Sequence, residues 1–266
     1  MSLAVLLASL AASQGQALEL SVAHEPSLAA ASVAWDGRTV PLAHAGDRWL
    51  AVLGIDLDTV PGAYEARVQL RYTDGRERML TEEIVVEAVE FPTTRLEVEP
   101  RYVELSPEDQ ARAARESRAM AAVYETVTPE RYWTEPFIVP IPGTQGGRNF
   151  GHRRVFNGQA RAPHSGADLR AATGTAILAA NRGKVVLAGD LFFSGNAVFI
   201  DHGLGVSSVY LHLSEIEVDE GEIVERGTVL GRAGATGRVT GPHLHWGARV
   251  LDARVDPFSL LSVGRP

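Results

Sequence analysis

Alternation of apolar and polar residues dominates the chain from residue 18 to residue 90. The stretch LELSVA at 18–23 alternates, and residues 63–90 hold two alternating runs joined by Asp74-Gly75, a dipeptide typical of tight hairpins. A period of two turns one side of each strand toward a core and the other toward solvent. We therefore predict a small Ig-like β-sandwich over residues 18–90, whose polar side chains form a solvated sheet face.

The pattern changes in residues 91–141. Ser106 is a suitable N-cap, Pro107 fits the first helical position, and Asp109 complements the positive N-terminal end of a helix. A weak apolar stripe follows until Thr128-Pro129, where the proline disfavours helical backbone at the residue before it. Three prolines in residues 136–142 then favour extended backbone. We predict a helical and proline-rich linker over residues 91–141.

Glycine turns separate strand-length runs of Val, Ile and Leu from residue 142 to residue 262. Examples are NAVFIDHG at 196–203, VSSVYLHL at 206–213 and HLHWGARV at 243–250. These runs predict an all-β domain, so we expect the chain as a whole to be mainly β. Six of the eight histidines lie in this domain, and candidate chemistry is therefore concentrated there.

The composition removes several classes of function. The net charge is −8 and the acidic residues are dispersed, so we expect no nucleic-acid partner. The chain has no cysteine, which excludes disulfides and thiolate ligands. Any metal must then be held by His, Asp or Glu.

The N-terminus carries a separate signal. Residues 3–12 read LAVLLASLAA, an apolar run that is too short to cross a bilayer as a helix. Polar SQGQ and the small Ala17 follow, as they do after the core of a signal peptide. We predict a signal peptide over residues 1–17 and export to the periplasm, the cell envelope or the extracellular space; the alternative is a buried first strand or helix. No later segment reads as a membrane span, so none is expected in the mature protein.

Four histidines and one aspartate form a pattern that points to a zinc site. His164 and Asp168 lie four apart in PHSGAD, where the proline and the glycine favour a loop. His212 lies in the apolar strand VYLHL. His243 and His245 lie two apart in GPHLHWG, so on a strand they share a face with Cα atoms about 6.5–7 Å apart. Zinc in hydrolases takes three protein ligands and a water, which leaves the other residues for proton transfer.

The three motifs together resemble those of the lysostaphin-type (LytM-like) zinc metallopeptidases, which cut peptide cross-links in bacterial peptidoglycan. The matching stretches are HSGAD at 164–168, YLHL at 210–213 and GRVTGPHLHW at 237–246, within a resemblance that covers about residues 142–261. The resemblance implies an antiparallel β peptidase domain at residues 142–262. It also implies hydrolysis of stem peptides or cross-bridges by a metal-activated water, with envelope proteins as further partners.

The resemblance implies a role for each residue of the pattern. His164, Asp168 and His245 would bind one Zn²⁺ per chain. His212 and His243 would be the catalytic residues, which face the substrate and move protons without binding the metal. The sequence leaves open which of these two histidines is the general base.

Three aromatic residues near the motifs have two interpretations. Tyr210, Trp246 and Phe156 either line the cleft and bind the substrate or belong to the aromatic core of the β domain. In VYLHL, the alternation puts Tyr210 and His212 on the same strand face.

Other functions are weaker interpretations of the same residues. A non-catalytic regulator that binds the cell wall and activates another hydrolase would have no need for the five metal-site residues. A biotinyl or lipoyl carrier domain needs a lysine on an exposed hairpin, but the single lysine, Lys184, has no methionine beside it. Only the resemblance argues against a zinc hydrolase that acts on another peptide or on a small ester.

Overall fold

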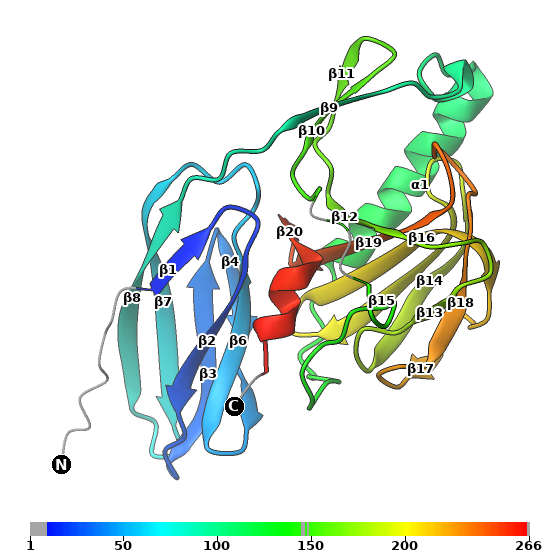
Figure 1. Ribbon diagram of the computed structural model, residues 1–266. Coiled ribbons are helices and arrows are strands. Elements are labelled where there is room, and N and C mark those ends of the chain that lie inside the picture. The colour runs from blue at the N-terminus through cyan, green and yellow to red at the C-terminus, as the bar shows by residue number, and fades with distance from the viewer. Residues whose placement is uncertain (1–9, 145–146, 148, 265–266) are drawn as a thin grey trace.

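The computed structural model describes residues 10–144, 147 and 149–264, and it contains two β-rich units (Figure 1). The N-terminal unit consists of a five-stranded sheet, β1-β8-β7-β3-β4, and a three-stranded sheet, β2-β6-β5. The predicted hairpin is present, because β7 and β8 pair antiparallel around a turn in which Gly75 has a φ of 85°. The mainly β class is confirmed, whereas the Ig-like subtype stays a prediction. The strands are β1 (Leu10–Ser13), β2 (Ala17–Ala23), β3 (Leu28–Trp35), β4 (Arg38–Pro41), β5 (Ala43–Ala45), β6 (Arg48–Gly54), β7 (Gly62–Tyr72) and β8 (Glu77–Glu87).

The predicted signal peptide lies partly outside the described residues, which begin at Leu10. The end of its apolar run forms β1, which pairs in parallel with β8 and buries Ala12. Ala17, the expected end of the leader, is the buried first residue of β2. Export therefore stays a prediction, and the alternative of a first strand describes the residues from Leu10 onward.

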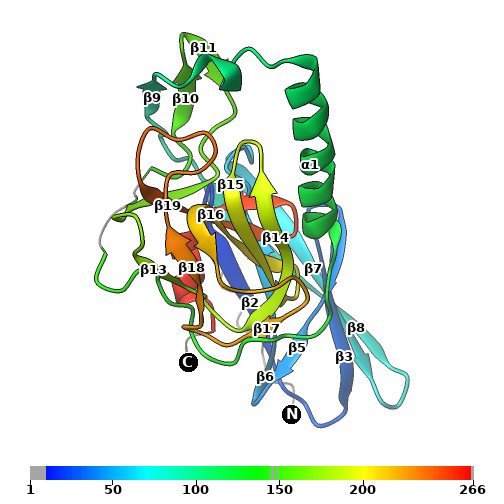
Figure 2. The same ribbon diagram turned by 90° about the vertical axis from the view of Figure 1, so that its right-hand side faces the viewer.

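The C-terminal unit is built on one antiparallel sheet with the order β12-β19-β16-β15-β14-β17. Strand β18 pairs with both β13 and β16, and β20 pairs with β19. A smaller sheet, β11-β10-β9, stands at one end of this unit (Figure 2). Short strands and glycine turns thus follow the pattern expected for residues 142–262. The elements are β9 (Thr93–Leu96), η1 (Pro100–Tyr102), β10 (Arg153–Phe156), β11 (Gln159–Arg161), β12 (Gly166–Arg170), β13 (Ala176–Leu178), β14 (Gly183–Leu191), β15 (Gly195–Gly203), β16 (Val206–Ile216), β17 (Ile223–Val224), β18 (Val229–Ala233), β19 (His243–Val250), β20 (Ala253–Val255) and η2 (Pro257–Ser262).

The predicted helix is present as α1 (Pro107–Glu125), and the Oγ of Ser106 caps it by accepting from the backbone N–H of Asp109 at 3.1 Å. None of its residues is buried, but its apolar side chains pack beside Phe199 of β15. Glu116 also accepts a hydrogen bond from the backbone N–H of Phe192 at 2.7 Å. The helix therefore lies along the sheet of the C-terminal unit rather than acting as a free spacer (Figure 2). No described helix has the length and apolarity that a membrane crossing requires.

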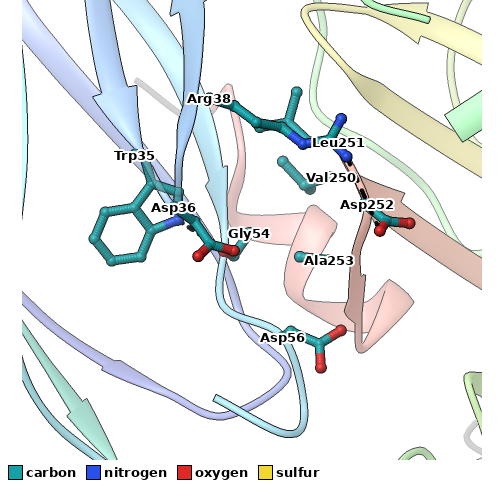
Figure 3. Close-up of a pocket in the computed structure, with 9 residues that line it drawn as sticks. All are labelled: Trp35, Asp36, Arg38, Gly54, Asp56, Val250, Leu251, Asp252 and Ala253. Carbon is teal, nitrogen blue, oxygen red and sulfur yellow. Dashed lines mark hydrogen bonds and ion pairs between the residues drawn. The ribbon is translucent and has the colours of Figure 1, made fainter. Parts of the chain in front are cut away.

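The two units share one hydrophobic core. Trp133 and Phe137, which lie in the predicted linker before residue 142, are also buried in that core. β6 meets the β19–β20 hairpin at Gly54, where an added Cβ would lie 2.6 Å from the Cβ of Ala253. Beside this contact a small pocket of about 130 Å³ separates Trp35 from the hairpin (Figure 3). The close approach at Gly54 makes this junction a packed interface.

An ion pair also crosses the same junction, and we expect it to contribute to stability. The guanidinium of Arg254 donates to both carboxylate oxygens of Asp56, at 2.5 and 2.9 Å, and to Asp58 at 2.6 Å. Burial raises the pKa of Asp56, but the bonds from Arg254 outweigh it and the pKa is lowered. We expect Asp56→Ala to reduce the free energy of unfolding in urea by about 1–3 kcal/mol, because charge-assisted bonds are lost. Asp58 is largely exposed, so the matched Asp58→Ala should cost less than about 1 kcal/mol, and equal losses would contradict the assignment.

Candidate metal centre

The pairing of β12 with β19 places two of the predicted ligands on one sheet face. Asp168 lies directly opposite His245, and His245 lies directly opposite Leu211 of β16. Residues that face each other across neighbouring strands point to the same side of a sheet. The next pairs along, Ala167 with Trp246 and Trp246 with Tyr210, therefore point to the other side, which is the core.

His164 joins these two residues from the loop before β12, where its backbone N–H donates to the carbonyl of His152. Its Nε2 lies 2.9 Å from Nδ1 of His245 and 3.0 Å from Oδ1 of Asp168. Nδ1 of His245 lies 2.9 Å from the same carboxylate oxygen. The structure thus brings together the three residues that the sequence analysis assigned to the metal.

The protonation of His164 follows from its second nitrogen. Nδ1 lies 2.9 Å from the backbone carbonyl of Asn149, which can only accept, so Nδ1 carries the hydrogen and Nε2 presents a lone pair. Burial, chiefly, lowers the pKa of His164 to about 4 and keeps the ring neutral. Two imidazole nitrogens and a carboxylate oxygen are ligands that suit zinc. Their spacing is close to the roughly 3.3 Å expected between tetrahedral ligands with metal bonds of about 2.0–2.1 Å.

Two further residues orient Asp168 and were not anticipated from the sequence. The side-chain amide of Asn149 donates to Oδ2 at 2.9 Å and accepts from the backbone N–H of Asp168 at 2.9 Å. Arg154 approaches the same Oδ2 at 3.4 Å. Burial raises the pKa of Asp168, but its contacts with His164 and His245 outweigh burial and lower the pKa, so the carboxylate is ionised. These contacts leave Oδ1 to face the two histidines.

His212 and His243 lie next to the three candidate ligands. Their ring centroids are 5.0 Å apart, and Nε2 of His243 lies 3.6 Å from Oδ1 of Asp168. Nδ1 of His212 donates to the carbonyl of Thr236 at 2.9 Å, and Nδ1 of His243 donates to the carbonyl of Gly241 at 2.8 Å. Both neutral rings therefore keep a lone pair on Nε2, because a carbonyl oxygen cannot donate. Burial, followed by the charges of His245 and His243, lowers the pKa of His212 to about 3.

The backbone at His212 corrects the expected alternation of VYLHL. Tyr210 faces the core, whereas the ring of His212 lies 6.1 Å from that of His245 on the other face. His212 has a φ of 67°, a left-handed conformation that few non-glycine residues adopt, and the β16 register shifts on both sides of it. This irregularity re-aims the histidine toward the candidate ligands, as bulges near functional sites often do.

All three of the predicted substrate-contacting aromatic residues are buried. Tyr210 and Trp246 have no exposed surface, and the Tyr210 hydroxyl accepts from the backbone N–H of Ala180 at 2.8 Å. Phe156 is only 3% exposed, with Arg154 and Arg238 beside its ring. The core interpretation fits these contacts, because ring faces that are covered by protein cannot meet a substrate.

A pocket of about 330 Å³ opens over the candidate metal centre. Thr94 of β9, Arg154 of β10, Arg170 of β12 and the catalytic candidate His243 line it together with His164 and Asp168. His152 also lines the pocket and is hydrogen-bonded to Thr94 at 2.8 Å. A substrate that enters between the small sheet and the loop 240–242 therefore reaches the candidate ligands directly.

Gly166 has to be a glycine for His245 to keep its place. A Cβ at Gly166 would lie 2.6 Å from Nε2 of His245 and 2.6 Å from the carbonyl oxygen of Trp246. We expect Gly166→Ala to displace the imidazole and weaken zinc binding by about 10- to 100-fold, as loss of a supporting contact around a metal ligand does. A competition assay with a metallochromic chelator measures this. Gly189→Ala, at a β14 glycine that has open space around it and no positive φ, is the control, and equal zinc affinity of both variants would contradict the argument.

His202 is a structural histidine, and its burial leads us to expect that folding stability falls at acidic pH. Its Nδ1 donates to the carbonyl of Arg182 at 2.8 Å, and its Nε2 lies 2.7 Å from the hydroxyl of Ser208. Burial lowers its pKa from 6.5 to about 4. Between these values the unfolded chain binds the extra proton, so stability falls as the pH drops from about 6.5 to 4, by on the order of 3 kcal/mol. Urea unfolding of metal-free protein at several pH values should show this decline, and His202→Asn should show a smaller one; equal slopes would contradict the assignment.

The chain is similar to known peptidases over this region and beyond it. Residues 162–257 match peptidase family M23. A crystal structure of a Pseudomonas aeruginosa protein classed as an M23 peptidase matches with a TM-score of 0.66 and 34% identity, over 91% of this chain and 92% of that chain.

Two curated relatives match a shorter part of the chain. Peptidoglycan DD-endopeptidase ShyA of Vibrio cholerae is 44% identical over 99 residues, which is 37% of this chain and 23% of ShyA. DD-carboxypeptidase/endopeptidase Mpg of Neisseria meningitidis is 43% identical over 97 residues, which is 36% of this chain and 22% of Mpg. The match therefore covers less than a quarter of either relative.

Proposed function

The chain belongs to peptidase family M23, and on this premise we propose that it is a zinc-dependent endopeptidase that hydrolyses peptide cross-links of bacterial peptidoglycan. The observation that carries the proposal is the meeting of His164, Asp168 and His245, whose ligand atoms all lie within 4.8 Å of one another at the bottom of an open pocket. Among the relatives, ShyA and Mpg are named as peptidoglycan or DD-peptide hydrolases, which supports this substrate class.

The three ligands hold one Zn²⁺ in this proposal, and neighbouring residues orient His164 and Asp168 for it. Asn149 fixes the tautomer of His164 and, with Arg154, turns Oδ1 of Asp168 toward the histidines. When bound, zinc supplies Lewis acidity, which polarises the scissile carbonyl and makes water a stronger nucleophile.

His212 and His243 handle protons on the side of the site that faces the substrate. Each holds its hydrogen on Nδ1 against a backbone carbonyl and offers the lone pair of Nε2. One ring accepts a proton from the attacking water, and an imidazolium can then protonate the leaving amine. The lowered pKa of His212 keeps its ring neutral near neutral pH.

A peptidoglycan substrate places the protein outside the cytoplasm, which agrees with the signal peptide predicted at the N-terminus. The experiment that tests the proposal is incubation of purified, zinc-loaded protein with intact sacculi, with and without a chelator, followed by mass spectrometry of the released muropeptides. We expect chelator-sensitive loss of cross-linked dimers. No release from any type of sacculus, despite one bound zinc, would instead favour the non-catalytic regulator.

A further inference from the structure

Three arginines lie beside the candidate metal centre, and two of them pack on the ring of Phe156. The guanidinium carbon of Arg238 lies 4.9 Å from the ring centroid of Phe156 and 4.4 Å from that of Phe193. Arg154 stacks on Phe156 at 5.8 Å, and Arg161 follows on the hairpin that β10 and β11 form. We refer to Arg154, Arg161 and Arg238 as the arginine cluster.

The positive charge of this cluster is poorly compensated. Among the described residues, the guanidinium of Arg238 has no hydrogen bond or ion pair. Nε of Arg161 is buried without a hydrogen-bond partner, although its terminal nitrogen donates to Val103 and Gln159. Among the described residues, the ion-pair partner of Arg154 is Asp168, at 3.4 Å, and that carboxylate is already shared with two histidines.

Three neighbouring cations with one shared carboxylate are electrostatically unfavourable, because buried charges are normally paired. Burial, followed by the charges of Arg154 and Arg161, lowers the pKa of Arg238 to about 10, which reflects the same repulsion. An anion placed among the three guanidinium groups would relieve it. Unfavourable local arrangements of this kind are often retained at ligand-binding sites.

The position of the arginine cluster indicates which anion it binds. Arg154 lines the pocket over the candidate ligands. Arg238 lies two residues after Thr236, whose carbonyl accepts the hydrogen bond from Nδ1 of His212. Arg238 also belongs to the loop that leads to His243. A group bound here therefore lies next to the bond being cut, within the same substrate molecule.

We propose that Arg154, Arg161 and Arg238 form a subsite for a carboxylate of the peptide substrate and make the enzyme selective for acidic peptides. The planar guanidinium forks match a carboxylate in paired hydrogen bonds, and the rings of Phe156 and Phe193 hold one fork in place. The inference rests on the proposed function, because it assigns a substrate group to the pocket of that enzyme.

The test compares two substrates and three proteins. The probes are cross-linked muropeptide dimers with free carboxylates and the same dimers converted to carboxamides. The proteins are full-length, zinc-loaded wild type, Arg238→Met, which keeps an apolar side chain between the rings, and Arg153→Met, an exposed neighbour on β10 as the matched control. Chromatography of the released monomers yields kcat/KM for each pair.

We expect wild type and Arg153→Met to prefer the free carboxylates by about 10- to 100-fold, the value of one charge-assisted hydrogen bond. Arg238→Met should lose this preference, because its kcat/KM should fall only for the free-carboxylate dimer. Equal losses on both dimers would show a packing role and overturn the subsite, as would a wild type without preference. The wild-type comparison decides the matter even where Arg238→Met does not fold. Cleavage of neither dimer by zinc-loaded wild type would contradict the proposed function itself.

Discussion

A His245→Ala variant is expected to lose bound zinc and peptidase activity together. His245 places Nδ1 2.9 Å from both His164 and Asp168, so its removal leaves two ligands where three converge. Lewis acidity contributes several kcal/mol of transition-state stabilisation, and about 1.4 kcal/mol corresponds to a factor of ten, so activity should fall by about 10³-fold or more. Metal analysis after dialysis and the rate of muropeptide release measure the two losses.

The control for this variant is His24→Ala, because His24 lies in the N-terminal unit, far from His245 in the sequence, and does not line the pocket. It should keep one zinc per chain and full activity. A His245→Ala protein that still binds zinc stoichiometrically, or that remains active without it, would contradict the ligand assignment. Circular dichroism of both variants should match wild type, because His245 supplies ligand atoms rather than core volume.

His164, Asp168 and His245, which the structure brings together, could be grouped from the sequence because each belongs to a short motif with its own spacing. HLH on a strand puts two imidazoles on one face, and the pairing of β12 with β19 then places Asp168 opposite His245. Such periodicity is local, so it is readable from the sequence. The helix was predictable for the same reason, since Ser106 and Pro107 lie next to each other in the chain.

The remaining features depend on contacts between distant segments. Asn149 binds Asp168 across 19 residues, and nothing in NFG indicates that partner. The left-handed backbone of His212 breaks the alternation that would have placed it beside Tyr210. The shared core of the two units, which includes Trp133 of the predicted linker, likewise arises from tertiary packing. Irregular backbone at His212 is the kind of departure from local rules expected near a functional site.

A His212→Asn variant is expected to keep zinc and lose activity. Asparagine tolerates the φ of 67° that this position requires, so the strand should be retained while the imidazole is removed. The ring of His212 lies 6.1 Å from that of His245, and its Nδ1 is engaged with Thr236, so no metal ligand is lost. Positioned proton transfer contributes about 10²–10⁴-fold, and kcat should fall by that factor. Zinc content and kcat on cross-linked muropeptides are measured on the same preparation.

His243→Asn is the matched partner in this experiment, because its ring holds the same tautomer against Gly241 and lies 5.0 Å from His212. If one ring accepts the proton from water and the other stabilises charge or donates to the leaving amine, removing both should cost less than the product of the two single losses, since they act as a unit. A His212→Asn protein that is folded but empty of zinc would move His212 into the ligand set. Unchanged kcat with zinc bound would instead remove it from the reaction, and the proton-accepting role would then pass to His243.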